Sequence, residues 1–304
     1  MKIAHISDLH YLDLTGVKFY EFFNKRWTGG FNLLAGRAHT HQKSVVVAAL
    51  ERIKALQCAH LVVTGDLTNL AFTSEFVAVR ELLKNYFDEK NLTIVPGNHD
   101  FYTRESSKAR RFEKLIYENY PGDEAFRGNE NWPFVQVRGD VALIGLCSAQ
   151  PRPWFVAAGR VGQIQRLHLE DLLKRPELEN KCKIIALHHH LYQVVTSPGE
   201  RFRHLDDRKE LLELCHKYHV DLVVHGHNHD FTQYKSENTV ISEAGSCSVA
   251  AAQKDNRRGK FNIYNIENAA LRSIETYRYN EQTMSFDLWK ITPLEEIPNA
   301  PQLR

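Results

Sequence analysis

The sequence has no long apolar run. Although 43% of its 304 residues are hydrophobic, the longest apolar segments, such as 141–147, are far shorter than the roughly 20 residues that a membrane-spanning helix needs. The N-terminus also lacks the pattern of a secretory signal, because Lys2 leads directly into a short strand-like segment and then to Asp8. We therefore expect a cytoplasmic protein.

Paired cysteines and a large charge of one sign are absent as well. The five cysteines stand singly in apolar stretches without CxxC spacing, at Cys58, Cys147, Cys182, Cys215 and Cys247. This pattern predicts buried free thiols in a reducing compartment. The formal net charge is only +2, so the chain does not have the basic field that would indicate nucleic-acid binding. We find no repeat and no low-complexity linker.

The sequence is instead rich in histidine, with 16 residues, many of them in five short polar clusters. The clusters are Asp8-Leu9-His10, Gly65-Asp66, Gly97-Asn98-His99-Asp100, His188-His189-His190 and Gly226-His227-Asn228-His229. Each one follows an apolar segment that we expect to be a strand. Oxygen and nitrogen donors without cysteine suit divalent ions such as manganese, iron or zinc. One cluster of this kind is common by chance, but five in series predict a metal site.

Predicted strands and helices alternate along most of the chain, and strands alone follow. In the alternating part we expect strands at 3–6, 61–64, 92–95, 183–187 and 222–225, a hairpin of 134–137 with 141–146, and helices at 44–56, from Ser74, at 107–120, at 163–174, and from Asp206 or Asp207 to His219. Beyond Phe231 we expect strands at 261–266, 271–279 and 284–291.

This order of elements predicts an α/β fold with two mixed sheets packed face to face between helices, a four-layer αββα sandwich. We place one domain at 1–292, which includes an insertion at 11–43, and a C-terminal tail at 293–304 that contains three prolines. Ligands of such sheets gather at the carboxyl ends of the strands, and all five clusters fall there.

Local geometry favours convergence of the clusters. Residues i and i+2 of an extended segment point the same way, so Asp8 with His10, and His227 with His229, can each present two donors to one place. The glycines that open three of the clusters allow tight turns and close backbone approach.

The five motifs, in this order over residues 1 to about 250, resemble those of the calcineurin-like metallophosphoesterase superfamily. The resemblance implies that one metal is held by Asp8, His10 and His229, that the other is held by Asn98, His188 and His227, and that Asp66 bridges the two. It also implies that His99 is the catalytic histidine. Among the three consecutive histidines, the family pattern favours His188, the first after the strand. His190 has the same parity and could be the donor or a substrate contact. The family motif often continues with proline, where this chain has Leu191.

The chemistry that the resemblance implies is hydrolysis of a phosphate ester. Two divalent ions, with manganese favoured and iron or zinc as alternatives, clamp the phosphoryl oxygens and activate a shared water as hydroxide, which attacks phosphorus. His99 is placed to donate a proton to the leaving oxygen. We expect Asp100 to orient one of the histidines. Asn69 either supports the Asp66 loop and the substrate or is merely a polar residue at a helix entry.

Two segments bear on the substrate. The first is the insertion, in which aromatic and basic residues are interleaved over 19–34. It is either a helix that caps the core, or a lid or surface for acyl chains or the face of the inner membrane. It resembles the insertion of the UDP-diacylglucosamine pyrophosphatases of lipid A synthesis, especially the chlamydial type. The second segment contains Arg152 and Arg160, with Arg201, Arg203 and Arg208 later. These arginines either grip additional phosphates or form surface salt bridges.

We therefore expect a hydrolase that cleaves a phosphodiester or pyrophosphate bond in a small nucleotide-like or lipid-linked molecule such as UDP-2,3-diacylglucosamine. A cyclic-nucleotide phosphodiesterase is the alternative, because the same five motifs would serve it equally. A nuclease is disfavoured by the lack of a basic tract. A non-catalytic metal-binding scaffold would be expected to have lost ligands, and none is missing from the motifs.

Overall fold

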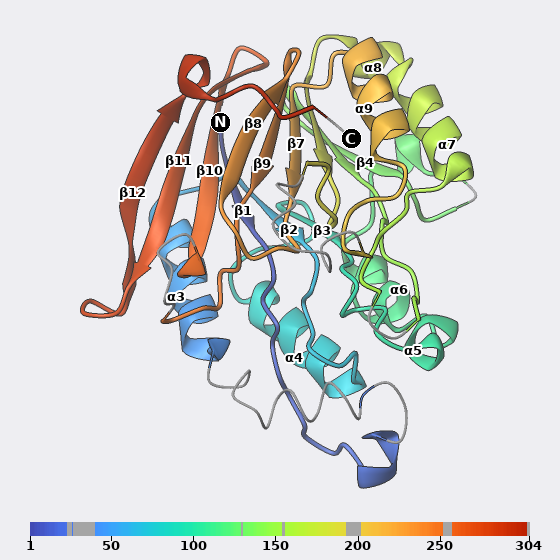
Figure 1. Ribbon diagram of the computed structural model, residues 1–304, viewed down its shortest axis with the longest axis vertical. Coiled ribbons are helices and arrows are strands. Elements are labelled where there is room, and N and C mark those ends of the chain that lie inside the picture. Colours follow the sequence, from blue (N-terminus) through green and yellow to red (C-terminus); the bar gives the residue numbers. More distant parts are fainter. Residues whose placement is uncertain are drawn as a thin grey trace.

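The computed structural model describes residues 1–22, 26, 40–128, 130–153, 156–192, 202–251 and 257–302. Two six-stranded mixed sheets form the centre of the molecule (Figure 1). The first sheet has the order β12-β11-β10-β1-β2-β3 and the second the order β4-β5-β6-β7-β9-β8. The predicted α/β class with two mixed sheets is confirmed.

The strands of the first sheet are β1 (Lys2–Ile6), β2 (His60–Thr64), β3 (Leu92–Val95), β10 (Lys260–Glu267), β11 (Ala270–Asn280) and β12 (Ser285–Pro293). Those of the second are β4 (Phe134–Arg138), β5 (Val141–Gly145), β6 (Cys182–Ala186), β7 (Leu222–His225), β8 (Thr232–Ser236) and β9 (Thr239–Glu243). In the first sheet β1, β2 and β3 are parallel, and in the second β5, β6, β7 and β9 are parallel. The carboxyl ends of both parallel sets are where the polar clusters begin.

The helices are α3 (Lys43–Ala55), α4 (Thr73–Lys84), α5 (Arg104–Lys108), α6 (Arg111–Leu115), α7 (Gln163–Leu173), α8 (Pro176–Glu179) and α9 (Arg208–Lys217), with 3-10 turns η1 (Phe19–Phe22), η3 (Tyr117–Asn119), η4 (Glu124–Phe126) and η7 (Leu294–Glu296). In Figure 1, α7, α8 and α9 lie on the side of the molecule opposite the hairpin of β11 and β12. None of the helices in the described ranges is long and apolar enough to cross a membrane.

Three apolar clusters account for the layering. One joins the facing sides of the two sheets, with Ile3 and Val62 from the first sheet and Leu143 and Val224 from the second. A second packs α3, α4 and α6 on the outer face of the first sheet, and a third packs α7 and α9 on the outer face of the second. Because a sheet with two apolar faces must be covered on both, the order is helix, sheet, sheet, helix.

The prediction of a single helix at 107–120 is wrong. Phe112, Ile116 and Tyr120 are buried at a spacing of four residues, which produced the helical pattern. Arg110, however, has a left-handed backbone with φ 52°. The chain therefore forms α5, α6 and η3 in succession instead of one helix.

Two helices begin close to the predicted residues, Ser74 and Asp206 or Asp207, but neither has a side-chain cap at its first turn from those residues. Ser74 lies inside α4, which begins at Thr73, and its hydroxyl donates to the Asp13 carbonyl. Asp207 does precede α9, but its carboxylate accepts from the Val161 and Gly162 backbone N–H groups rather than from the helix. Two observed strands, β8 and β9, lie between Phe231 and the next predicted strand and were not predicted.

The C-terminal segment follows β12 without a break in packing. Lys235 of β8 donates its backbone N–H to the Pro298 carbonyl and accepts from the Ala300 N–H, each at 2.8 Å. Ile297 is buried in the cluster between the sheets. This part of the predicted tail is therefore packed against the edge of the second sheet.

Candidate metal centre

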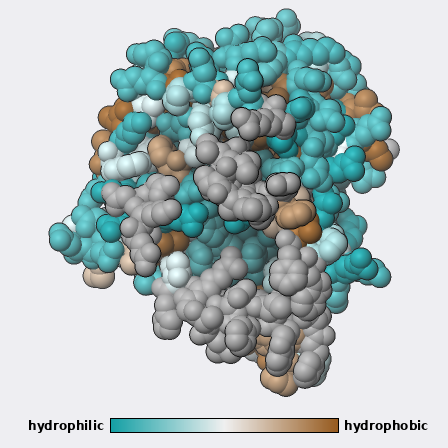
Figure 2. Space-filling model, in the orientation of Figure 1, coloured by the Kyte–Doolittle hydropathy of each residue, from teal (hydrophilic) through white to brown (hydrophobic). Residues whose placement is uncertain are grey.

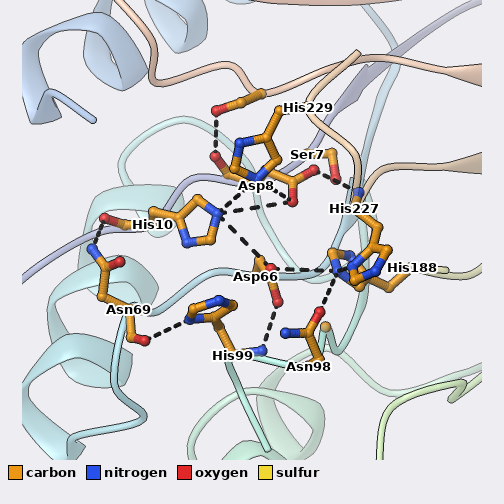
Figure 3. Close-up of polar contacts among 12 residues, drawn as sticks. Ser7, Asp8, His10, Asp66, Asn69, Asn98, His99, His188, His227 and His229 are labelled. Carbon is orange, nitrogen blue, oxygen red and sulfur yellow. Dashed lines mark hydrogen bonds and ion pairs between the residues drawn. The ribbon is translucent and has the colours of Figure 1, made fainter. Parts of the chain in front are cut away.

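The five polar clusters meet at the carboxyl ends of β1, β2, β3, β6 and β7 (Figure 3). The backbone at several of the predicted ligands is left-handed: φ is positive at Asp8, His10, Asp66, His227 and His229. Parity along an extended strand is therefore the wrong reason for their convergence. Such conformations are uncommon for residues other than glycine, and they gather at functional sites where the surrounding fold enforces them.

One group of donors comes from the turns after β1 and β7. His229 Nε2 lies 3.2 Å from Asp8 Oδ1 and 3.0 Å from His10 Nε2. The Asp8 carboxylate is fully buried, and its other oxygen accepts from the His227 backbone N–H at 3.0 Å. The two segments are thereby joined although they are 219 residues apart in the chain.

A second group contains the side chains of Asp66, Asn98, His188 and His227. His188 Nε2 lies 3.4 Å from Asp66 Oδ2, 3.2 Å from Asn98 Oδ1 and 3.1 Å from His227 Nδ1. His188 Nδ1 lies 2.7 Å from the Thr64 carbonyl, a contact that fixes the ring with Nε2 toward the cluster.

Asp66 joins the two groups. Figure 3 shows its carboxylate between His10 and His188, and Oδ2 lies 3.8 Å from His10 Nε2 and 3.4 Å from His188 Nε2. The other oxygen accepts from the His99 backbone N–H at 2.7 Å. One carboxylate thus faces donors from both sides of the centre.

Burial and neighbouring charges shift the pKa values of these side chains in directions that favour binding of a cation. Burial alone would raise the pKa of Asp66, but the neighbouring His188 and His99 hold it well below its ordinary value. Burial and the adjacent His189 and His188 rings keep the pKa of His227 well below its ordinary value. At His188 burial acts to lower the pKa, but the Asp66 carboxylate more than offsets it and raises the pKa to about 9. Without a metal, a proton on His188 therefore balances the charge of the Asp66 carboxylate. A cation bound to Asp66 and His188 would displace this proton.

The donor set fits divalent cations. Within the described residues, three sets of side chains each bring ligand atoms within 4.8 Å of one another: His10 with His41 and His229, His10 with Asp66 and His99, and Asp66 with His188 and His227. The buried His227 Nε2 has no hydrogen-bond partner among the atoms that the structure describes. Facing ring nitrogens about 3 Å apart, as in His10 and His229, are both satisfied when a cation takes the lone pairs.

Comparison with known proteins agrees with this geometry. The family model for calcineurin-like phosphoesterases matches residues 1–231. The chain belongs to the calcineurin-like phosphoesterase family. It is accordingly a metal-dependent phosphoesterase, as the sequence predicted. No curated protein sequence matches this phosphoesterase.

Solved structures share the fold of this phosphoesterase at low identity. The purple acid phosphatase PPD1 from yellow lupin seeds (Lupinus luteus) has a TM-score of 0.63 at 12% identity over 96% of this chain, which spans only 53% of the lupin chain. A dimetal phosphatase from Danio rerio has a TM-score of 0.55 at 12% identity, with 90% of this chain and 94% of that chain covered. TT1561 of Thermus thermophilus has a TM-score of 0.52 at 10% identity, with 91% and 98% covered.

His99 and Asn69 lie together beside the metal centre of the phosphoesterase. His99 Nδ1 lies 2.7 Å from the Asn69 carbonyl, and the ring stacks on Tyr102 with centroids 5.2 Å apart. The Asn69 side-chain amide donates to the His10 carbonyl at 2.5 Å. Asn69 therefore connects the Asp66 loop to a candidate ligand and to the candidate catalytic histidine, while itself being almost fully buried.

Asp100 does not orient a histidine, contrary to the prediction. Its buried carboxylate accepts from the backbone N–H groups of Gly97, Leu67 and Thr68, at 2.9, 3.3 and 3.0 Å. It thus ties the loop that carries Asp66 to the loop that carries Asn98. Burial, with the nearby Asp66, raises the pKa of Asp100 to about 7.

The remaining predicted residues have other surroundings. Of the three consecutive histidines, His188 is the one that meets Asp66 and Asn98, while His190 stacks on His227 with centroids 5.6 Å apart. Arg152 pairs with Asp206 at 2.5 Å, which is the salt-bridge alternative. Arg160 is exposed. Arg203, by contrast, donates to the His227 carbonyl at 3.3 Å, so this guanidinium is next to the centre.

Two glycines allow the close approach that the sequence predicted. A Cβ on Gly97 would lie 2.2 Å from Asp66 Oδ1, and a Cβ on Gly226 would lie 1.9 Å from Ser7 Oγ and 2.3 Å from Asp8 Oδ2. The candidate ligands therefore occupy the space that any larger side chain would need.

Sequence reasoning missed three residues around Asp8. Ser246 and Ser248 both donate to the Asp8 carbonyl, at 2.7 and 3.0 Å, and His41 approaches His10 and His229. No strand pattern precedes His41 and no motif contains the serines, so the sequence offered no local signal for them.

Proposed function

We propose that this phosphoesterase hydrolyses a phosphodiester or pyrophosphate bond in a small nucleotide-like or lipid-linked molecule, with two divalent cations and manganese as the preferred metal. The observation that carries the proposal is the position of Asp66, whose Oδ2 faces His10 on one side and His188 on the other. The residues present would hold one cation at Asp8, His10 and His229 and another at Asn98, His188 and His227. When bound, the cations would neutralise phosphoryl charge and lower the pKa of water toward about 7.

The protein's own residues orient the reaction. His99 Nδ1–H donates to the Asn69 carbonyl, and the protonated form of the ring presents Nε2–H as the proton donor for the leaving oxygen. Arg203, exposed and next to His227, is suited to a second phosphate of a pyrophosphate substrate. Asp100 holds the loop that carries Asp66 against the loop that carries Asn98. Its contribution to the reaction is to position these two side chains.

The beginning of the insertion supports an apolar or lipid-linked substrate. Phe19 and Tyr20 in η1 are 72% and 63% exposed, whereas Phe22 packs on Phe72 with centroids 5.2 Å apart. Arg26 is buried and donates to the Leu70 and Ala71 carbonyls, which follow Asn69 in the chain. Most of the predicted lid, including 27–39, lies outside the described residues.

We propose a location in the cytoplasm with at most peripheral membrane contact, and the surface bears on the second part of this proposal. The described residues on the face in Figure 2 are mainly hydrophilic, and the apolar ones form small separate groups. Exposed aromatic residues beside Lys18, whose amine lies 5.8 Å from the Tyr20 ring centroid, are typical of peripheral contact rather than of insertion.

The test is a hydrolysis screen with added manganese that covers bis-p-nitrophenyl phosphate, cyclic nucleotides and UDP-2,3-diacylglucosamine. We expect cleavage of the soluble diester and faster, selective cleavage of the lipid-linked pyrophosphate. Selective cleavage of cyclic nucleotides would favour the cyclic-nucleotide phosphodiesterase. No hydrolysis of any phosphate ester with manganese, iron or zinc would refute the proposed function.

A further inference from the structure

His41 lies at the metal centre although no sequence motif contains it. It stands at the end of the insertion, two residues before α3. Its ring centroid is 4.5 Å from that of His10 and 5.4 Å from that of His229. Ligand atoms of these three histidines all lie within 4.8 Å of one another, a spacing that one cation can accommodate. Only His10 and His229 belong to the predicted ligand set.

The position of His41 is fixed by the same segment that holds Asp8. His41 Nδ1 lies 2.7 Å from Ser248 Oγ, and that hydroxyl is also 3.0 Å from the Asp8 carbonyl. The backbone of His41 forms an antiparallel bridge with Val249, and the Gln42 N–H donates to the Ser248 carbonyl at 2.8 Å. Side chain and backbone are thus both anchored, as is usual for a group that must meet a metal ion with accuracy.

We propose that His41 is a further ligand of the cation held by Asp8, His10 and His229. This inference rests on the proposed function only in requiring that the protein binds two cations. Counting the shared Asp66, the first cation then has five candidate protein ligands, whereas the second has four, namely Asp66, Asn98, His188 and His227. The two sites therefore differ in affinity, and the difference depends on the histidine at the end of the insertion.

The experiment measures binding of Mn²⁺ to metal-free protein by isothermal titration calorimetry, with metal content checked by mass spectrometry. We expect two dissociation constants for the wild type. His41→Ala raises the lower dissociation constant, that of the cation held by Asp8, His10 and His229, by about 10–100-fold, the range seen when support of a metal site is removed. The dissociation constant of the second cation stays unchanged. His41→Asp, which returns an oxygen donor, recovers part of the loss. The matched control is His168→Ala, since His168 is exposed on α7, and it binds as the wild type does.

Circular dichroism of the metal-free variants separates loss of a ligand from loss of the fold. If His41→Ala does not fold, crystals of the manganese-loaded wild type decide the matter by anomalous scattering. A His41 nitrogen within about 2.5 Å of an ion supports the proposal, and a separation beyond about 3 Å overturns it.

Two further outcomes distinguish this inference from the proposed function. Unchanged binding of both ions in a folded His41→Ala overturns only the role of His41. A wild type that binds no Mn²⁺, Fe²⁺ or Zn²⁺ overturns both.

Discussion

Replacing Gly226 by alanine tests whether close packing at the carboxyl end of β7 holds the metal centre together. The added Cβ would lie 1.9 Å from Ser7 Oγ and 2.3 Å from Asp8 Oδ2. Real contacts of this kind are essentially never shorter than 3.0 Å, so Ser7 Oγ must move by about 1.1 Å and Asp8 Oδ2 by about 0.7 Å relative to the backbone of residue 226 (3.0 less 1.9 and 3.0 less 2.3).

Neither neighbour can move freely. The Ser7 hydroxyl donates to the Thr64 carbonyl at 2.8 Å, and Asp8 Oδ2 accepts from the His227 N–H. Overpacking of this kind lowers the free energy of unfolding by about 1–3 kcal/mol, which for a chain of this length corresponds to a melting temperature lower by roughly 2–5 °C. A displacement approaching 1 Å at a reacting centre lowers the rate by about 100-fold.

The assay compares kcat/KM for bis-p-nitrophenyl phosphate with Mn²⁺, bound manganese and thermal unfolding. Gly128→Ala is the matched control, because a Cβ at Gly128 meets nothing within 4 Å; its stability should stay within about 0.5 kcal/mol of the wild type. For Gly226→Ala we expect about 100-fold lower kcat/KM and weaker manganese binding. Retention of full manganese content and of kcat/KM within about threefold of the wild type would refute the reasoning.

Three further predictions concern the same centre and the core. Asp66→Ala and His99→Ala should both abolish turnover, with metal lost only from the first, because only Asp66 faces both groups of donors; metal analysis that finds full retention in Asp66→Ala would count against the bridging role. Asp100→Asn should lower the free energy of unfolding by about 1–3 kcal/mol, because the amide must face a buried N–H donor; a lower rate with unchanged urea unfolding would instead indicate direct participation in catalysis. Burial lowers the pKa of His5 and of His60 to about 3, so between pH 6.5 and 3 the unfolded chain binds more protons at these residues and acid destabilises the fold. Between pH 7.5 and 5.0, each of the two histidines lowers the free energy of unfolding of the metal-free protein by about 2 kcal/mol. In urea titrations over this pH range, His60→Gln should therefore lose about 2 kcal/mol less than the wild type. The same pH dependence in variant and wild type would contradict the lowered pKa of His60.

The motifs were predictable because each depends on chemistry that is local in the chain. An apolar strand followed by glycine and by donors such as Asp66 or His227 signals both the sheet and its functional edge. The order of these motifs was also enough to indicate the family. In one place the spacing of apolar residues gave a wrong prediction. Phe112, Ile116 and Tyr120 are buried four residues apart and suggested one helix, but the left-handed backbone at Arg110 divides this segment.

By itself, then, the sequence determined most of the strands, the polar ends of those that carry the site, and the kinds of donor that the site contains. The tertiary structure alone decided which donors meet, because partners such as Asp8 and His227 come from segments 219 residues apart. It also decided that Asp100 binds backbone N–H groups and that His41 joins the centre. These outcomes depend on contacts between distant loops, for which no pattern in a single stretch of chain carries a signal.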